Sequence, residues 1–183
     1  MALYTGKGDK GDTYFFNCNQ RFSKSSEKAE ALGSVDETNS LIGFCRVKSK
    51  EFTVEMEGFS LAGVLKQVQE DLFVVQANLA GSNKKVSEEK ITRLEEVIIR
   101  IEKEMPPIKK FFIPGGSELS ALLDFTRCVA RRAERATVAL NEKEGGVDVA
   151  VLSYLNRLSS FLYALARLVN FKLKIEEDSP SYE

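Results

Sequence analysis

The chain has 183 residues, with 26 basic and 27 acidic side chains and a formal net charge of −1. This length suits one domain with a buried core. The balanced charge excludes the strongly basic surface that most nucleic-acid-binding proteins carry. Histidine is absent, which excludes a serine–histidine–aspartate triad and the usual zinc sites. Chemistry must therefore rest on positioning, cationic side chains and a hard cation.

Cysteine usage and hydropathy point to a cytoplasmic protein. Cys18, Cys45 and Cys128 are far apart and form no C-x-x-C pair, which favours a reducing compartment. We expect Cys45 and Cys128, which stand among apolar residues, to be small core side chains. No apolar run approaches membrane-spanning length, and the N-terminus lacks the apolar region of a signal peptide. Neither a membrane nor nucleic acid is therefore expected as a partner.

The first segment of the chain is rich in glycine, aspartate, lysine and serine, which predicts an irregular loop. Gly6, Gly8 and Gly11 match G-x-G-x-x-G, but no strand precedes them and no helix follows, so the dinucleotide match is accidental. Glycines still let backbone N–H groups approach phosphate oxygens, and the neighbouring lysines supply charge. A flexible, solvated arm is the competing interpretation.

Apolar residues at three- and four-residue steps predict five long helices in the rest of the chain. Ser87 and Ser117 are suited to cap the third and the fourth, and proline or glycine pairs follow these two helices. The expected ranges are 26–47, 59–80, 88–105, 117–141 and 149–172.

Long helices joined by short loops predict an all-α protein, namely an up-and-down five-helix bundle with an irregular N-terminal nucleotide-binding loop. We expect a single domain over residues 1–183. The loop would occupy 1–25 and the bundle 26–172, and a polar tail over 173–183 would be frayed.

The expected fourth helix carries a row of cations. Arg127, Arg131 and Arg135 are four residues apart, so they lie along one face and repel one another. Glu134 offsets only part of this charge, and the row is tolerable where an anion such as a phosphate lies against it. A solvated face with a local ion pair is the competing interpretation.

Two other polar residues lie near apolar stripes. Asp36 falls among apolar residues of the first helix, where a carboxylate close to buried surface needs a cationic partner. The alternative is an exposed side chain paired within its own helix. Asn156 is one step from the stripe of the fifth helix, where its amide could contact a ribose or base, or simply bond a neighbouring helix.

Taken in order, six segments of the chain resemble the ATP:cob(I)alamin adenosyltransferases. The stretches R-R-A-E-R and Y-L-N-R-L-S are individually specific, and the similarity extends over nearly the whole chain. The glycine turn at Lys7 and the residues Thr38 and Ser160 depart from the family pattern. The matching segments are 4–13, 21–24, 35–40, 114–117, 127–135 and 154–159.

The resemblance implies a ferritin-like bundle that transfers the 5′-deoxyadenosyl group of ATP to the cobalt of cob(I)alamin and releases triphosphate. It implies a homotrimer with ATP and Mg²⁺ between subunits, cobalamin as the second substrate, and a corrinoid reductase and a B12-dependent enzyme as partners. By motif match the ATP site would comprise Thr5, Gly6, Lys7, Gly8, Thr13, Tyr14, Lys24, Arg131, Arg132, Glu134, Arg135 and Asn156.

The same resemblance implies more specific roles. Arg131 would act in catalysis, and Glu134 would also hold the magnesium ion. Phe111, before the Pro-Gly-Gly turn, would contact the cobalamin and help to displace its lower axial base. Asp36 and Arg127 would form a salt bridge between subunits.

The residue chemistry suits this reaction, because cob(I)alamin is already a strong nucleophile and needs no histidine as a general base. Two other classes of function remain open. One is a helical ATP-binding regulatory module without transfer activity, which would not need the corrinoid surface around Phe111. The other is a structural bundle with a solvated arginine face, which leaves the glycine loop and Lys24 unexplained.

Overall fold

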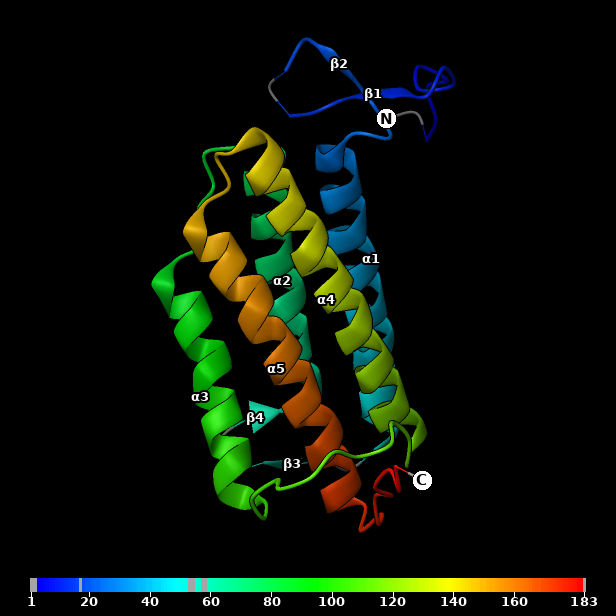
Figure 1. Ribbon diagram of the computed structural model, residues 1–183, viewed down its shortest axis with the longest axis vertical. Helices are drawn as coiled ribbons and strands as arrows, with labels where there is room; N and C mark the ends of the chain where they lie inside the picture. The colour runs from blue at the N-terminus through cyan, green and yellow to red at the C-terminus, as the bar shows by residue number, and fades with distance from the viewer. Residues whose placement is uncertain (1–2, 17, 53–54, 57–58, 183) are drawn as a thin grey trace.

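A computed structural model describes residues 3–16, 18–52, 55–56 and 59–182. Within them, five α-helices run alternately up and down and form one bundle (Figure 1). The predicted all-α bundle is therefore confirmed, with helix ends within a few residues of those expected. The helices are α1 (Glu27–Lys48), α2 (Leu61–Leu79), α3 (Glu88–Glu104), α4 (Glu118–Glu144) and α5 (Val149–Lys172), and a short 3₁₀ turn, η1 (Ser49–Glu51), follows α1.

Capping side chains explain where most helices begin. The hydroxyls of Ser26, Ser60 and Ser117 each accept a hydrogen bond from a backbone N–H in the first turn of α1, α2 and α4, which satisfies one of the unpaired donors there. Asp148 does the same for α5. Ser87 stands in the N-cap position of α3 but makes no side-chain capping bond.

The N-terminal segment is more regular than the predicted loop. Strand β1 (Asp12–Tyr14) pairs antiparallel with β2 (Arg21–Ser23), and the Phe15 and Phe22 ring centroids lie 4.9 Å apart. A second small hairpin, β3 (Glu55–Met56) with β4 (Phe59–Ser60), lies between α1 and α2. Strands of two or three residues are too short to leave a recognisable alternation in the sequence.

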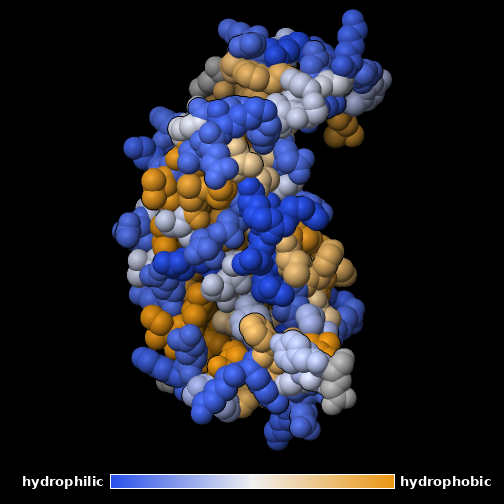
Figure 2. All heavy atoms as spheres, viewed as in Figure 1, coloured by the Kyte–Doolittle hydropathy of each residue, from blue (hydrophilic) through white to orange (hydrophobic). Residues whose placement is uncertain are grey.

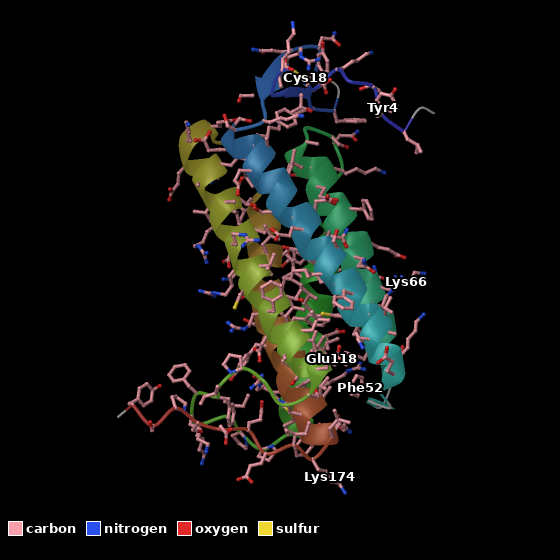
Figure 3. The ribbon with its side chains drawn as sticks, turned by 90° about the vertical axis from the view of Figure 1, so that its right-hand side faces the viewer. Tyr4, Cys18, Phe52, Lys66, Glu118 and Lys174 are labelled. Carbon is pink, nitrogen blue, oxygen red and sulfur yellow. The ribbon has the colours of Figure 1, made fainter. Side chains whose placement is uncertain are left out.

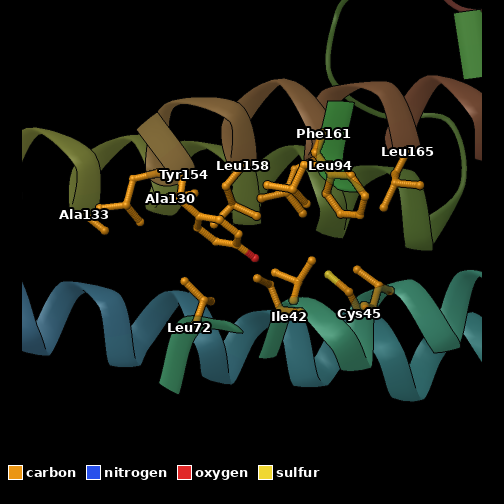
Figure 4. Packing of buried hydrophobic residues seen from close by; sticks show 14 of the residues in the cluster. Ile42, Cys45, Leu72, Leu94, Ala130, Ala133, Tyr154, Leu158, Phe161 and Leu165 are labelled. Atoms are coloured by element: carbon orange, nitrogen blue, oxygen red, sulfur yellow. The ribbon is translucent and has the colours of Figure 1, made fainter. Parts of the chain in front are cut away.

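The core lies where α4 packs against α1 and α5, α1 against α2, and α3 against α5. Figure 4 shows Ile42 and Cys45 of α1 and Leu72 of α2 facing Leu158 and Phe161 of α5. On the outside, hydrophobic patches interrupt a mostly hydrophilic surface (Figure 2).

Helix α5 is long and apolar enough to cross a membrane by length and composition alone. No segment of this kind was expected from the sequence. Leu155, Leu162 and Leu165 are fully buried in the bundle, so α5 has the character of a core helix that is covered on most sides by its neighbours.

Only one of the two cysteines expected in the core is there. Cys45 is buried, and its sulfur lies 3.3 Å from the Thr126 hydroxyl oxygen. Burial raises the pKa of the Cys45 thiol to about 11. Cys128 is exposed, because Val129 and Ala130 take the inward positions of that turn of α4. The three cysteines are free thiols.

A buried carboxylate joins three helices. Asp71 of α2 is 1% exposed and pairs with Lys90 and Arg93 of α3. It also accepts a hydrogen bond of 3.4 Å from the Tyr154 hydroxyl of α5. Burial and this neighbouring carboxylate raise the pKa of Tyr154 well above its ordinary value, so the phenol stays a donor.

The tail after α5 is not the frayed segment that its polar sequence predicts. It runs back beside the connection between α3 and α4 (Figures 1 and 3), where the backbone N–H of Ile113 donates to the carbonyl of Asp178 at 2.8 Å. Glu177 pairs with the buried Arg167. These contacts offset the conformational entropy that the tail loses when it is ordered. The polar composition of the tail gave no sign of them.

Candidate active site

The glycine loop folds back onto Lys24. Gly6 adopts a left-handed φ of +64° and its carbonyl accepts from the Asp9 N–H, which makes the first turn. The Lys24 ammonium donates to the Gly8 carbonyl at 3.0 Å, and the backbone N–H of Lys24 donates to the Gly11 carbonyl at 2.9 Å. A Cβ at Gly8 would lie 2.9 Å from the Lys24 Nζ, so the loop and Lys24 form one unit.

A second set of contacts, made by Arg21, holds this loop, and no role for Arg21 was predicted from the sequence. Arg21 donates to both carboxylate oxygens of Asp12 and to the Lys7 carbonyl, and its guanidinium lies 4.6 Å from the centre of the Tyr14 ring. The hydrogen bond from Arg21 holds the pKa of Asp12 below its ordinary value. In the sequence, only the position of Arg21 within the family-like segment 21–24 pointed to a role for this residue.

The predicted loop residues are therefore gathered at one place. Thr5 and Lys7 are exposed, and the Lys7 N–H donates to the Thr5 hydroxyl at 3.4 Å. Thr13 is half-buried, and Tyr14 is 51% exposed. The hairpin lies beyond the N-terminal end of α1, whereas the connection from α3 to α4 crosses the opposite end of the bundle (Figure 1).

The arginines of α4, namely the predicted row and the neighbouring Arg132, lie on two neighbouring surfaces. Arg127 and Arg131 line a hollow of about 400 Å³ between α3, α4 and α5, while Arg132 turns toward α1 and pairs with Glu37. The hydrogen bond to Glu37 raises the pKa of Arg132. Within the described part of the chain, Arg131 and Arg135 have no carboxylate within ion-pair distance. Their charges are available to an external anion.

Glu134 and Asn156, which were assigned to the same site, lie in contact. The Asn156 amide donates to the Glu134 carboxylate at 2.9 Å across α4 and α5, and Arg157 donates to the Asn156 oxygen at 2.9 Å. Over the described ranges, no cluster of three or more acidic or cysteine side chains suited to a metal occurs. Glu134 thus stands as a single carboxylate beside an amide.

A second hollow, of about 490 Å³, lies beside the connection between α3 and α4. Phe111, 76% exposed, lies on its wall together with Phe112, Arg167 and two lysines. Arg127 and Tyr163 line both hollows. Phe111 and Arg131, predicted for the two substrates, therefore belong to one continuous surface.

Asp36 and Arg127 do not meet within one chain. Asp36 is exposed and accepts from the Gln76 amide at 3.1 Å, so its expected place near buried surface is wrong. Val35 and Thr38 take the inward positions of that turn. Arg127 donates to Asp124 at 3.4 Å and lies 5.8 Å from the centre of the Tyr163 ring. The predicted pair concerns two chains and stays a prediction.

The geometry can be compared with that of known proteins. A family model described as cobalamin adenosyltransferase matches residues 3–169. This chain belongs to the cobalamin adenosyltransferase family. The family assignment confirms the resemblance that the six segments carried.

Individual family members are similar along most of the chain. The corrinoid adenosyltransferase of Bacillus subtilis is 39% identical over 175 residues, covering 93% of this chain and 87% of the relative. The PduO corrinoid adenosyltransferase of Citrobacter freundii is 37% identical over 91% of this chain, which spans only 49% of that relative.

Solved structures of the family agree with the fold. A phenylalanine-to-histidine variant of the PduO-type ATP:corrinoid adenosyltransferase from Lactobacillus reuteri, complexed with cobalamin and ATP, superposes with a TM-score of 0.88 at 30% identity and covers 98% of this chain and 97% of its own. An arginine-to-lysine variant complexed with ATP gives a TM-score of 0.85 at 31% identity, over 97% and 99% of the two chains.

Proposed function

We propose that this chain transfers the 5′-deoxyadenosyl group of ATP to the cobalt of a reduced corrinoid. The observation that carries the proposal is the continuous surface on which the cationic Arg131 and the exposed Phe111 line two hollows with shared walls. Family membership supports the same reaction. Arg131 in the first hollow would contact the triphosphate of ATP, and the exposed Phe111 in the second suits contact with a large, mostly apolar ring system.

The chemistry needs little from the protein except position and charge. Cobalt(I) attacks C5′ of ATP, the bond from C5′ to the triphosphate oxygen breaks, and triphosphate leaves with the electron pair. Arg131 and Arg135, together with Lys7 and Lys24 of the loop, would stabilise the negative charge that develops on the leaving group. Alignment of the cobalt, C5′ and the leaving oxygen would supply the remaining rate acceleration.

The site is proposed to form between subunits of a homotrimer. In one chain the β1–β2 hairpin and the connection between α3 and α4, which carries Phe111, lie at opposite ends of the bundle (Figure 1). A loop from a second chain would therefore have to complete the nucleotide site. Exposed apolar side chains on adjacent helices support assembly: Phe44 of α1 is 50% and Phe125 of α4 57% exposed. Phe44 directly precedes Cys45, and Phe125 directly precedes Thr126. Because Cys45 and Thr126 contact each other, the two phenylalanines stand on facing turns of α1 and α4. Asp36 and Arg127 would pair across this interface.

Magnesium is proposed to accompany ATP at Glu134. Mg²⁺ in nucleotide sites usually keeps several waters and takes one or two carboxylates plus phosphate oxygens. A half-exposed Glu134, oriented by Asn156, fits the role of such a single carboxylate. When bound, the ion would neutralise charge on the triphosphate.

In the cell we expect a cytoplasmic enzyme that receives its corrinoid from a reductase and passes the product to a B12-dependent enzyme. Neither nucleic acid nor a membrane is a proposed partner. The charge balance of 26 basic and 27 acidic residues is in keeping with this expectation.

Phosphate products distinguish the proposed reaction from its alternatives. Incubation with ATP and chemically reduced corrinoid should release one intact triphosphate for each corrinoid adenosylated. Release of diphosphate or single phosphates would indicate an ATPase. ATP binding without any product would favour the regulatory module.

Arg131→Ala should weaken ATP binding or turnover about ten- to a hundredfold, because it removes a charged hydrogen bond of roughly 1.5–3 kcal/mol. Calorimetric titration with ATP and steady-state rates measure the loss. Arg100→Ala, an exposed arginine on α3, is the matched control and should leave both unchanged. Equal behaviour of the two variants would remove Arg131 from the site.

Phe111→Ala should impair the reaction of the corrinoid and leave ATP affinity nearly intact. The loss should be greatest when the enzyme starts from cob(II)alamin with a weak reductant, because the exposed ring would then no longer displace the lower axial base. Phe73→Ala, which removes a 66% exposed phenylalanine on α2, is the control. Normal cob(II)alamin reduction together with poor ATP binding would reverse the assignment.

A further inference from the structure

The segment after α5 is tied to the segment that carries Phe111. We call residues 174–180 the C-terminal strap. Lys174 adopts a left-handed φ of +57°, which turns the chain at the end of α5, and the Ile175 N–H donates to the Asn170 carbonyl at 2.9 Å. The Asp178 carbonyl then accepts from the Ile113 N–H at 2.8 Å. The strap thus bonds directly to the backbone two residues after Phe111, and Figure 3 shows the two segments side by side.

Glu177 is the anchor of the strap. Its side chain is 13% exposed and pairs with Arg167, which is 2% exposed. It also accepts from the Asn170 amide at 2.7 Å. Arg167 and Asn170 hold this enclosed carboxylate in place. If the carboxylate is removed, both donors lose an acceptor that they share.

Both partners of Glu177 also hold the connection around Phe111. Asn170 donates to the Gly115 carbonyl at 3.0 Å and accepts from the Ser117 N–H at 3.2 Å. A Cβ at Gly116 would lie 2.6 Å from the Asn170 amide, so this turn fits tightly against α5. The Arg167 guanidinium lies 5.7 Å from the centre of the Phe112 ring.

The same contacts extend into the arginine row. Arg167 pairs with Asp124, and Asp124 accepts from Arg127 at 3.4 Å. The guanidinium groups of Arg167 and Arg127 both lie within 6 Å of the Tyr163 ring centre, at 5.1 and 5.8 Å. One buried network therefore runs from the strap, beneath the Phe111 hollow, to the edge of the proposed nucleotide surface.

We infer that Glu177 is a positioning residue for the corrinoid half of the site. Through Arg167 and Asn170 it fixes the connection on which Phe111 stands, so that the exposed ring keeps one place at the edge of the hollow. This inference rests on the proposed function, because the position of Phe111 matters only if a corrinoid binds there. The competing account is that the strap only stabilises the end of α5.

Glu177→Gln keeps the size of the side chain and removes its charge, and Glu176→Gln at the neighbouring exposed position is the matched control. The Glu177 variant should lose about tenfold in rate from cob(II)alamin, as expected for one charged hydrogen bond. Its dissociation constant for ATP should stay within about twofold of the wild type. Equal losses toward ATP and corrinoid would assign Glu177 a general structural role and overturn the inference.

Two further measurements separate positioning from stability. Amide hydrogen exchange should speed up in residues 111–117, and the core helices should keep their protection. The double variant Glu177→Gln with Phe111→Ala should be no slower than Phe111→Ala alone, because Glu177 acts through that ring. Additive losses, or faster exchange throughout the bundle, would contradict the inference.

The exchange experiment does not depend on turnover. If the wild type transfers no adenosyl group, the proposed function fails, whereas local exchange around residue 113 still decides whether the strap holds this connection. If exchange at 111–117 is identical in the wild type and the Glu177 variant, the strap does not position Phe111, even in an active enzyme.

Discussion

Replacing Arg167 with methionine should lower the free energy of unfolding by about 3–5 kcal/mol, the usual cost of breaking a buried ion pair by removing one partner. The side chains of Arg167 and Asp124 are 2% and 4% exposed, and Glu177 is 13% exposed. Without the guanidinium, two carboxylates would share an enclosed site with little remaining compensation. Denaturation by urea gives the value directly.

Arg157→Met is the matched control for this stability prediction. Arg157 also lies on α5 and pairs with Glu95 at 2.7 Å, but the two side chains are 44% and 40% exposed. Exposed pairs of this kind contribute less than about 1 kcal/mol. Equal losses in the two variants would mean that the Arg167 network does not hold the end of the bundle. Adding Asp124→Asn should recover part of the Arg167 loss, because it removes one stranded charge.

Asp36→Ala should dissociate the proposed trimer, with a loss of about 3–5 kcal/mol for a pair buried at an interface. In the single chain Asp36 is exposed and has only the Gln76 amide as a partner, so its removal strands no charge inside its own subunit. Arg127→Ala should have the same effect on assembly. It is the less clean test, because Arg127 also bonds Asp124.

Light scattering at micromolar protein concentration measures this assembly. The wild type and Glu37→Ala should both be trimers, because Glu37 pairs with Arg132 within its own chain on an exposed surface. Exchanging the charges with Asp36→Arg and Arg127→Asp together should restore the trimer that each single change disrupts. A monomeric wild type, or single variants that remain fully assembled, would rule out the arrangement.

The helices could be predicted because each carries an apolar stripe over many turns with a clear boundary at its start. Ser117 illustrates such a boundary, since its hydroxyl accepts a hydrogen bond in the first turn of α4. The β1–β2 hairpin and the strap could not be predicted, because they are short, polar and stabilised by contacts with remote residues. The bond from Ile113 to Asp178 joins positions with no local pattern in common.

The candidate site divides in the same way. The glycine loop and the α4 arginines carry recognisable residue types at fixed spacing. The structure gathers the loop residues at one place and spreads the arginines over two neighbouring surfaces. The pairing of Asp12 with Arg21 and of Asp124 with Arg167 depends on how distant turns pack. Helical phase also explains why Cys128 is exposed. It stands one residue before the buried Val129, and one step along a helix separates the surface from the core.

The absorption spectrum of the corrinoid provides the most direct test of adenosyl transfer. The purified chain is mixed with ATP, Mg²⁺ and chemically reduced corrinoid in the absence of oxygen and light, and the spectrum is followed over time. We predict conversion of the cob(I)alamin spectrum to that of adenosylcobalamin, at a rate reduced about ten- to a hundredfold in Arg131→Ala. A folded wild type that binds ATP but leaves the cob(I)alamin spectrum unchanged would contradict the proposed function.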